Sequence, residues 1–200
     1  MSPSLLPQRA PAAVLDPVVR LLTALRVSPS MVTVAGVAGS AAAAVLIANG
    51  ALVTGGIVVI LAGALDMFDG ALARSTGRAS PFGALFDSTL DRISEAIVLF
   101  GLLWHELEEG HREESLLVFV TLAGSMLVSY VRARGEGLGV SVKSGLFARP
   151  ERIAVLGLAL ITGLVRAGLW VLAVATVVTA LHRLLVAGRA LAAPQDDRTK

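Results

Sequence analysis

The stretch DMFDGALARSTGRASPFGALFDSTLD, residues 66–91, decides what fold this chain can adopt, because it places four aspartates among apolar residues. Asp66 and Asp69 are three residues apart, and Asp87 and Asp91 are four residues apart. Side chains at these spacings project from one face of an α-helix. The stretch therefore predicts two neighbouring helices that each carry a pair of carboxylates.

The chain around this stretch is too apolar for a soluble domain of its size. Of its 200 residues, 55% are hydrophobic and 16% are charged, and the mean hydropathy is +0.77. Repeated apolar runs of roughly 17 to 22 residues can each cross a hydrocarbon core of ~30 Å as a helix. The composition predicts an all-α integral membrane protein with a single helical domain.

Interruptions in the apolar pattern predict six transmembrane helices. They cover residues 31–48, 55–74, 82–104, 115–132, 152–166 and 168–188. The predicted division is an N-terminal cytoplasmic segment at 1–30, the six-helix domain at 31–190 and a disordered tail at 191–200. Apolar residues at helical spacing beside Arg20 predict an amphipathic juxtamembrane helix in the N-terminal segment. A simple start to the first span explains that pattern equally well.

The distribution of Lys and Arg predicts the orientation in the membrane. Basic residues gather before the first span, in the second and fourth connections and at the C-terminal end, whereas the third connection, 105–114, is acidic. The positive-inside rule then places both termini and the aspartate-rich stretch on the cytoplasmic side of a multi-pass plasma-membrane protein. We expect no signal peptide and no acids in the far-side halves of the spans.

Carboxylates buried together need a partner of opposite charge, since each otherwise costs several kcal/mol. The two aspartate pairs lie at similar depth, so one divalent site could bind both pairs. With no cysteine and three scattered histidines, the ligands must be oxygens, and oxygen ligands beside a diphosphate favour Mg²⁺ or Mn²⁺. The alternative is that the aspartates cap helices or pair with arginines. That alternative would use Arg74, Arg78 and Arg92.

The spacing D-x2-D-G-x2-A-R-x8-G-x3-D-x3-D resembles the signature of the CDP-alcohol phosphotransferases. Its fixed positions are Asp66, Asp69, Gly70, Ala73, Arg74, Gly83, Asp87 and Asp91. The six spans, the amphipathic N-terminal helix and the segment from Val27 to Thr33 are also similar to that family. Ser30 departs from the asparagine that members commonly have there.

This resemblance implies a homodimer with a polar cavity open to the cytoplasm, surrounded by membrane lipids and without a nucleic-acid partner. Two divalent ions would be held by Asp66, Asp69, Asp87 and Asp91. The donor would be CDP-diacylglycerol or a related CDP-lipid, CMP would be released, and Asp91 would be the general base on the acceptor hydroxyl. The implied CDP-lipid contacts are Thr33, Asp69, Gly70, Ala73, Arg74 and Gly83. Gly70 and Gly83 would let a nucleotide approach the backbone, although close helix packing explains glycine too.

The fourth connection resembles the phosphatidylinositol-phosphate synthase branch, in which basic residues bind the phosphate of inositol 1-phosphate. The implied acceptor site is Arg132, Arg149, Arg152 and Arg183. The positive-inside rule explains arginines in a connection but not Arg183 within an apolar run. Inositol 1-phosphate is therefore the favoured acceptor. Glycerol 3-phosphate, as in a phosphatidylglycerol-phosphate synthase, is next, and serine or an unphosphorylated alcohol remains open.

A membrane cation transporter is the alternative from another class, because transporters also carry acids inside the membrane. Such a protein needs acids or broken helices along a path through the bilayer. The predicted acids instead gather at one end of the second and third spans. The clustering favours an enzyme.

Overall fold

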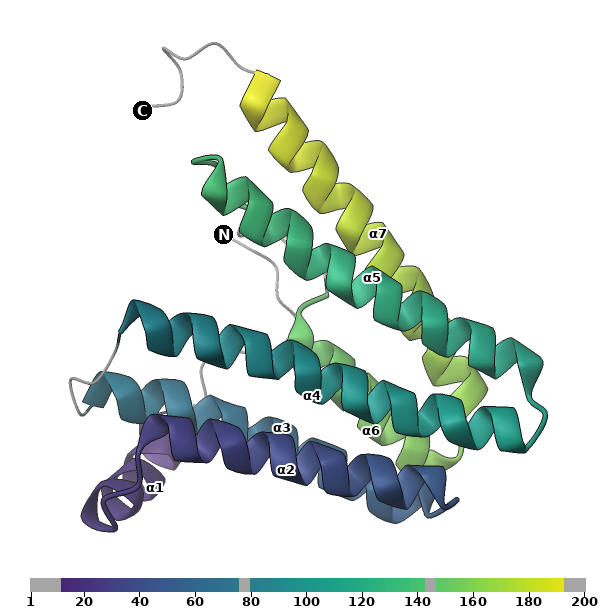
Figure 1. Cartoon of the computed structure of the whole chain (residues 1–200), viewed down its shortest axis with the longest axis horizontal. Helices are drawn as coiled ribbons and strands as arrows, with labels where there is room; N and C mark the ends of the chain where they lie inside the picture. Colours follow the sequence, from purple (N-terminus) through teal and green to yellow (C-terminus); the bar gives the residue numbers. More distant parts are fainter. Residues whose placement is uncertain (1–11, 76–79, 143–146, 193–200) are drawn as a thin grey trace.

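The computed structural model describes residues 12–75, 80–142 and 147–192, without the side chains of residues 12–16, Met67, Asp69 and Arg74. Within these ranges the regular structure is entirely helical (Figure 1). The helices are α1 (Ala12–Ala24), α2 (Pro29–Ala48), α3 (Leu52–Ser75), α4 (Pro81–Glu108), α5 (Arg112–Gly137), α6 (Arg149–Thr162) and α7 (Val165–Ala192). Of the tail expected at 191–200, residues 193–200 lie outside the described part of the chain.

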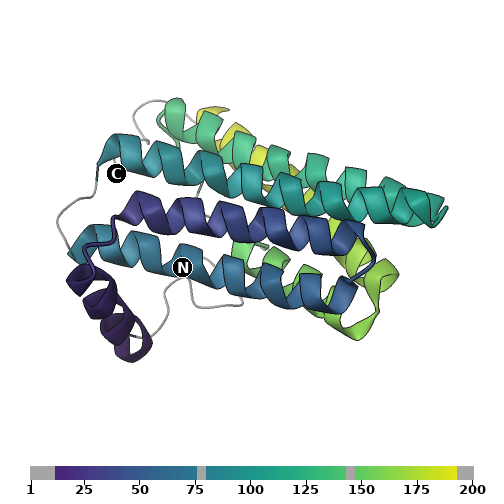
Figure 2. The ribbon, with the colours of Figure 1, turned by 60° about the horizontal axis from the view of Figure 1, so that its bottom comes forward.

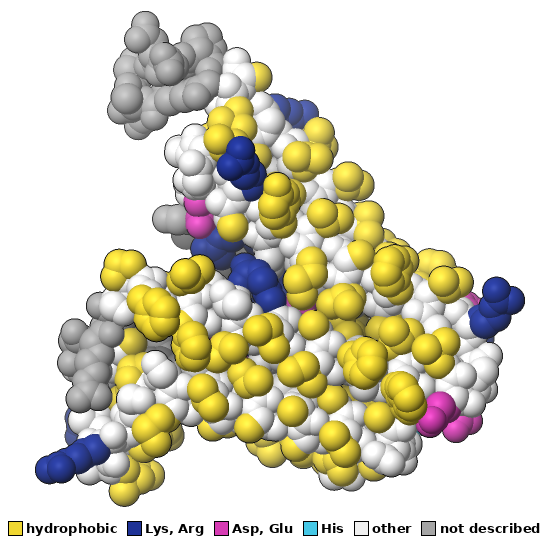
Figure 3. Space-filling view, in the orientation of Figure 1, with side chains coloured by type: hydrophobic (Ala, Val, Ile, Leu, Met, Phe, Trp, Pro, Cys, Tyr) yellow, Lys and Arg dark blue, Asp and Glu magenta, His cyan; other side chains and the backbone are white. Residues whose placement is uncertain are grey.

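Four of the described helices, α2, α3, α5 and α7, are long and apolar enough to cross a membrane. Helix α4 has 28 residues, but its first half carries several charged side chains, and α6 has 14 residues. Large apolar side chains are exposed on α2, α3, α5 and α7, and hydrophobic atoms cover much of the visible surface (Figure 3). Backbone groups in lipid must be satisfied within helices. The chain is therefore an all-α integral membrane protein.

Two groups of helices meet at an angle. Helices α2, α3 and α4 run side by side, whereas α5 and α7 pair with each other and diverge from α4 toward the C-terminal end (Figures 1 and 2). Helix α6 packs against both α3 and α7 and so joins the groups. The result is a wedge between α4 and α5 with the first turn of α6 near its apex (Figure 1).

Short turns close the end of the molecule opposite the mouth of the wedge. Gly50, Gly110 and Gly163 have φ angles of +78°, +75° and +74° in the connections α2–α3, α4–α5 and α6–α7. This left-handed conformation is strained for residues with a Cβ and ends a helix sharply. Each helix can therefore reverse direction within two or three residues.

Serine–proline pairs start two of the helices near the wedge. Ser28 Oγ accepts a hydrogen bond of 3.2 Å from the Met31 N–H, and Ser80 Oγ accepts one of 3.0 Å from the Gly83 N–H. The proline that follows each serine lacks an N–H and needs no partner in the first turn. Local sequence thus fixes where α2 and α4 begin.

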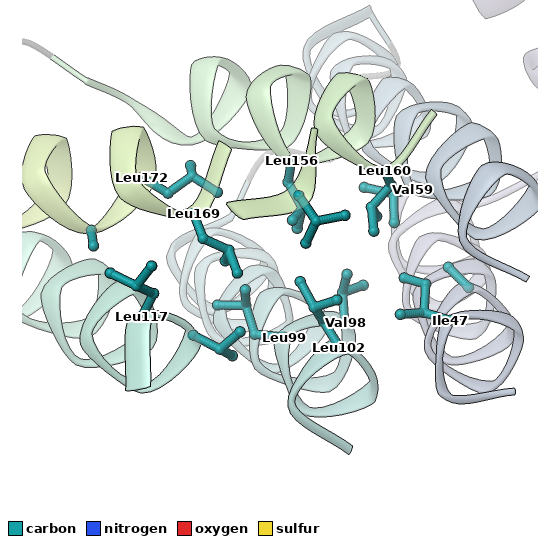
Figure 4. Packing of buried hydrophobic residues seen from close by; sticks show 14 residues of the cluster. Ile47, Val59, Val98, Leu99, Leu102, Leu117, Leu156, Leu160, Leu169 and Leu172 are labelled. Carbon is teal, nitrogen blue, oxygen red and sulfur yellow. The ribbon is translucent and has the colours of Figure 1, made fainter. Parts of the chain in front are cut away.

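The apolar core lies toward the end with the short turns (Figure 4). Leu99 and Leu102 of α4 pack with Leu160 of α6 and with Leu169 and Leu172 of α7, and all five are almost completely buried. A smaller cluster, formed by Val19, Val32 and Leu72, packs α1 against α2 and α3. The core keeps one end of the molecule closed while the wedge stays open at the other.

The six predicted spans correspond in order to α2–α7, but one connection differs. Because α4 continues to Glu108 and α5 begins at Arg112, most of the acidic connection expected at 105–114 is helical. Glu106 and Glu114 are buried within these helix ends, although both were expected in the connection between the spans. Glu106 Oε2 is 2.7 Å from His111 Nδ1, and Glu114 Oε1 is 2.5 Å from Arg166 Nε. These partners make the buried acids tolerable.

A close approach of α2 and α4 depends on Gly101. A Cβ on Gly101 would lie 2.5 Å from Ala44 O and 2.7 Å from Ala44 Cα, which are backbone atoms that cannot rotate away. Small residues that allow such approaches drive helix association in lipid, where apolar burial alone gives little. Gly101 therefore fixes the spacing of the two helices.

We expect Gly101→Ala to lower the thermal stability of the detergent-solubilised protein, with a loss of about 1–3 kcal/mol typical of overpacking. Gly188→Ala in α7 is the matched control, since a Cβ there meets nothing within 4 Å. Alanine is also the better helix former, so the control should be neutral or slightly stabilising. Equal melting temperatures for the two variants would contradict the close-approach argument.

Candidate active site

The acidic face of α4 borders a cavity of about 550 Å³ at the apex of the wedge. Asp87, Asp91 and Glu95 recur every four residues along this face, and all three line the cavity. The four candidate arginines line it too. They are Arg132 on α5, Arg149 and Arg152 on α6, and Arg183 on α7. Figure 3 shows Lys and Arg side chains gathered in the hollow between α4 and α5.

Arg149 joins two of the predicted aspartates from different helices. Its Nη1 lies 2.5 Å from Asp66 Oδ2 of α3 and 2.7 Å from Asp91 Oδ1 of α4. The two carboxylate oxygens are therefore within about 5 Å of each other. The structure thus brings one aspartate of each pair into contact with the same guanidinium group, that of Arg149.

Arg152 makes an ion pair with two hydrogen bonds at the cavity. Its Nε donates to Glu95 Oε1 at 2.7 Å and its Nη2 donates to Glu95 Oε2 at 2.9 Å. The Arg152 side chain is 6% exposed and that of Glu95 10% exposed. Paired hydrogen bonds between guanidinium and carboxylate fix both planes, so this contact ties the first turn of α6 to α4.

Arg132 and Arg183 face the cavity from the other side of the wedge. Arg132 Nε donates to Glu136 Oε1 at 3.0 Å, and both side chains are about half exposed. Arg183 is buried and its Nη1 donates to Val128 O of α5 at 2.9 Å. A buried arginine within an apolar span thus has a cavity to face, as expected for charges inside a membrane.

The residues expected to contact a CDP-lipid are distributed differently. Thr33 is buried on α2 and donates to Pro29 O at 3.2 Å. Gly70 and Ala73 lie in α3, and Gly83 lies in the first turn of α4. Among the described residues, none of these four lines the cavity with the arginines. The side chains of Asp69 and Arg74 lie outside the described part.

Two further residues shape the site although the sequence analysis did not single them out. Glu95 lies four residues after Asp91 and so continues the four-residue spacing of Asp87 and Asp91. That spacing was the sequence pattern that could have indicated Glu95. Gly36 of α2 faces Asp66: a Cβ there would lie 2.7 Å from Asp66 Oδ1. No sequence pattern indicated Gly36, because its importance depends on how α2 and α3 pack.

The donor atoms fit a divalent ion with oxygen ligands. Asp66 and Asp91 already direct oxygens at one positive nitrogen, and the absent side chain of Gly36 leaves room for the Asp66 carboxylate. Within the described residues no three acidic or histidine side chains form a ready metal-binding group, and the Asp69 side chain is not among them. Carboxylate oxygens are ligands that Mg²⁺ and Mn²⁺ prefer.

The fold and the cavity define a multi-pass membrane protein with acids and arginines facing one internal cavity. The sequence profile described as CDP-alcohol phosphatidyltransferase matches residues 26–181, so the chain belongs to this family. Membership in the family leaves the transporter alternative without support.

Within the family, several similar proteins are phosphatidylinositol phosphate synthases. The phosphatidylinositol phosphate synthase of Corynebacterium glutamicum is 35% identical over 192 residues, which cover 90% of this chain and 87% of that protein. The crystal structure of the Mycobacterium tuberculosis phosphatidylinositol phosphate synthase with CDP-DAG bound superposes with a TM-score of 0.81 at 34% identity, over 88% of this chain and 94% of that chain. The same synthase in complex with manganese and citrate gives a TM-score of 0.79 at 34% identity, over 86% and 88% of the two chains.

We expect Gly36→Ala to displace the Asp66 carboxylate and weaken Mn²⁺ binding by about 10- to 100-fold, as changes around metal ligands typically do. Gly39→Ala is the control on the same helix, because its Cβ would meet the Ala62 methyl at 3.2 Å and no carboxylate. Mn²⁺ titration followed by electron paramagnetic resonance measures the effect, and thermal unfolding checks the fold. Equal Mn²⁺ affinity in both variants would remove Gly36 from the site.

Proposed function

We propose that this protein transfers the phosphatidyl group of CDP-diacylglycerol to inositol 1-phosphate and releases CMP. The observation that carries the proposal is that Asp87, Asp91 and four arginines line the same cavity. Such a cavity can bind a phosphorylated acceptor beside the carboxylates that would act on its hydroxyl. The relatives named phosphatidylinositol phosphate synthase support this choice of acceptor.

The reaction needs one proton transfer and one phosphoryl-type displacement. The acceptor hydroxyl attacks the lipid-side phosphorus of the CDP-lipid, the bond from that phosphorus to the CMP oxygen breaks, and CMP leaves. Asp91 takes the hydroxyl proton, because it lines the acceptor cavity and also lies beside Asp66. Thr33, Asp69, Gly70, Ala73, Arg74 and Gly83 form the CDP-lipid site, and Arg74 steadies a phosphate.

Asp66, Asp69, Asp87 and Asp91 would hold two Mg²⁺ or Mn²⁺ ions in this proposal. Bound there, the ions supply charge neutralisation for the diphosphate and alignment of its oxygens. A related synthase was crystallised with manganese, which supports a divalent ion. Arg149 contacts two of these carboxylates and would then be available to the acceptor phosphate.

The topology follows from the same proposal. Helices α2–α7 form six spans, α1 lies on the cytoplasmic membrane surface, and both termini and the cavity face the cytoplasm of the plasma membrane. Support comes from the basic residues at the wedge end, from the exposed Leu21 of α1 and from the exposed Leu25 that follows α1. The domain covers 31–190, after the segment 1–30 and before the tail 191–200. The working unit would be a homodimer, as the family resemblance implies.

A panel of acceptors tests the proposal directly. Purified protein with CDP-diacylglycerol and Mg²⁺ should release CMP with inositol 1-phosphate in preference to glycerol 3-phosphate, serine and free inositol. Preference for free inositol would overturn the phosphate-binding cavity, and preference for glycerol 3-phosphate would make the protein a phosphatidylglycerol-phosphate synthase.

Replacing Arg183 with Gln should weaken apparent acceptor affinity by roughly 10- to 150-fold, because a charge-assisted contact is worth about 1.5–3 kcal/mol. The KM for CDP-diacylglycerol should change little. Arg189→Gln is the control, since Arg189 is an exposed arginine in the last turn of the same helix and does not line the cavity. If Arg183→Gln had the same KM for the acceptor as the parent protein, Arg183 would contribute only to orientation in the membrane.

Chelation should abolish CMP release, and Mg²⁺ or Mn²⁺ should restore it. Asn at Asp66 or Asp87 should weaken Mn²⁺ binding together with the rate, whereas Asp91→Asn should lose rate while keeping more of the ion and donor binding. The reason is that a base is needed only when the acceptor hydroxyl loses its proton. Near-parent turnover by Asp91→Asn would show that Asp91 is not the base.

A further inference from the structure

We propose that Glu95 is a positioning residue that orients Arg152 toward the phosphate of the acceptor. The inference rests on the proposed function and assigns Glu95, which is absent from the family signature, a part in acceptor binding. Glu95 pairs with one arginine through both of its carboxylate oxygens. Its role is therefore separable from those of Asp87 and Asp91.

The two helices match in register at this contact. Asp91 and Glu95 are one turn apart on α4, and their partners Arg149 and Arg152 are one turn apart on α6. The two pairs differ in geometry, because Arg149 uses one nitrogen for two carboxylates whereas Arg152 uses two nitrogens for one carboxylate. Two hydrogen bonds therefore fix the plane of the Arg152 guanidinium, whereas the carboxylates hold Arg149 at one nitrogen.

The remaining nitrogen of Arg152 is the one suited to a ligand. Nη1 lies 3.5 Å from Phe147 O, which is at the outer limit of a hydrogen bond, and Arg152 lines the cavity. A phosphate oxygen can take over this weak contact without disturbing the two hydrogen bonds to Glu95. The anion then meets a donor whose direction is already set, which lowers the entropy lost on binding.

Burial makes the arrangement rigid. The side chains of Glu95 and Arg152 are 10% and 6% exposed, so water competes little for their hydrogen bonds. Glu95 also offsets one of the four arginine charges that converge on the cavity. Without it, we expect Arg152 to turn toward other acceptors, such as the Phe147 carbonyl, and to present no fixed donor edge to the anion.

Binding and kinetics of Glu95→Gln, Arg152→Gln and the double variant test the proposal. We measure the Kd of inorganic phosphate by calorimetry, and the KM and kcat with inositol 1-phosphate at saturating CDP-diacylglycerol. Glu95→Gln should raise both the Kd and the acceptor KM by about 10-fold, with a smaller change in kcat. The double variant should match Arg152→Gln, because Glu95 acts through Arg152.

Two further variants separate positioning from general stability. Glu114→Gln is the matched control, since Glu114 is a buried carboxylate paired with Arg166 at the opposite end of the molecule. It should lower the melting temperature and leave phosphate affinity unchanged. Glu95→Asp keeps the charge and should recover most of the affinity that Glu95→Gln loses.

The outcomes distinguish this proposal from the function on which it rests. A parent protein that neither binds phosphate nor uses a phosphorylated acceptor would overturn both. Normal parent activity with an unchanged phosphate Kd in Glu95→Gln would overturn the positioning role alone. A Glu95→Gln effect that adds in full to that of Arg152→Gln would also overturn it, because Glu95 would then act independently of Arg152.

Discussion

Charged side chains inside a lipid bilayer must find partners within the protein, and this requirement organises the open end of the molecule. Arg149 and Arg152 begin α6 and reach carboxylates on α3 and α4. Apolar burial contributes little between helices that are already surrounded by lipid tails. The ion pairs therefore help to decide where α6 lies, and α6 in turn joins the two groups of helices.

The two ends of the molecule meet that requirement in different ways. At the end with the short turns, Glu106 and Glu114 each have one local or neighbouring partner beside a tightly packed leucine core. At the other end the charges border a cavity, and no comparable apolar cluster of described residues fills the wedge there. Rigid packing at one end supports the polar chemistry at the other, as sites built on a firm scaffold require.

Spacing in the sequence was sufficient for part of this arrangement. The positions of the two aspartate pairs in their helices predicted that carboxylates of α3 and α4 would lie at one depth, and Asp66 and Asp91 contact the same arginine. The six apolar runs correspond in order to α2–α7. Periodicity has this power because helical geometry converts residue number directly into depth and direction.

The rest depends on contacts between distant parts of the chain. Nothing local to Glu95 indicates that a guanidinium 57 residues later will bind it. The importance of Gly36 arises only once α2 and α3 pack together. The helical extension to Glu108 was missed because acidity predicted a connection, whereas Glu106 pairs with nearby His111 and Glu114 pairs with Arg166, which lies 52 residues later.

The short length of α6 bears on how a lipid donor and a water-soluble acceptor could meet in the proposed reaction. At 14 residues it is about 21 Å long, less than a hydrocarbon core of ~30 Å. In the proposed topology its charged first turn would lie below the level at which a full-length span ends, and a helix shorter than the hydrocarbon core is accommodated by local thinning of the bilayer. A lipid donor would not have to be lifted out of the bilayer to react. The water-soluble acceptor would instead enter the cavity to the depth of the donor's phosphate. The protein would thus bring water to the lipid phosphate and leave the lipid in the bilayer.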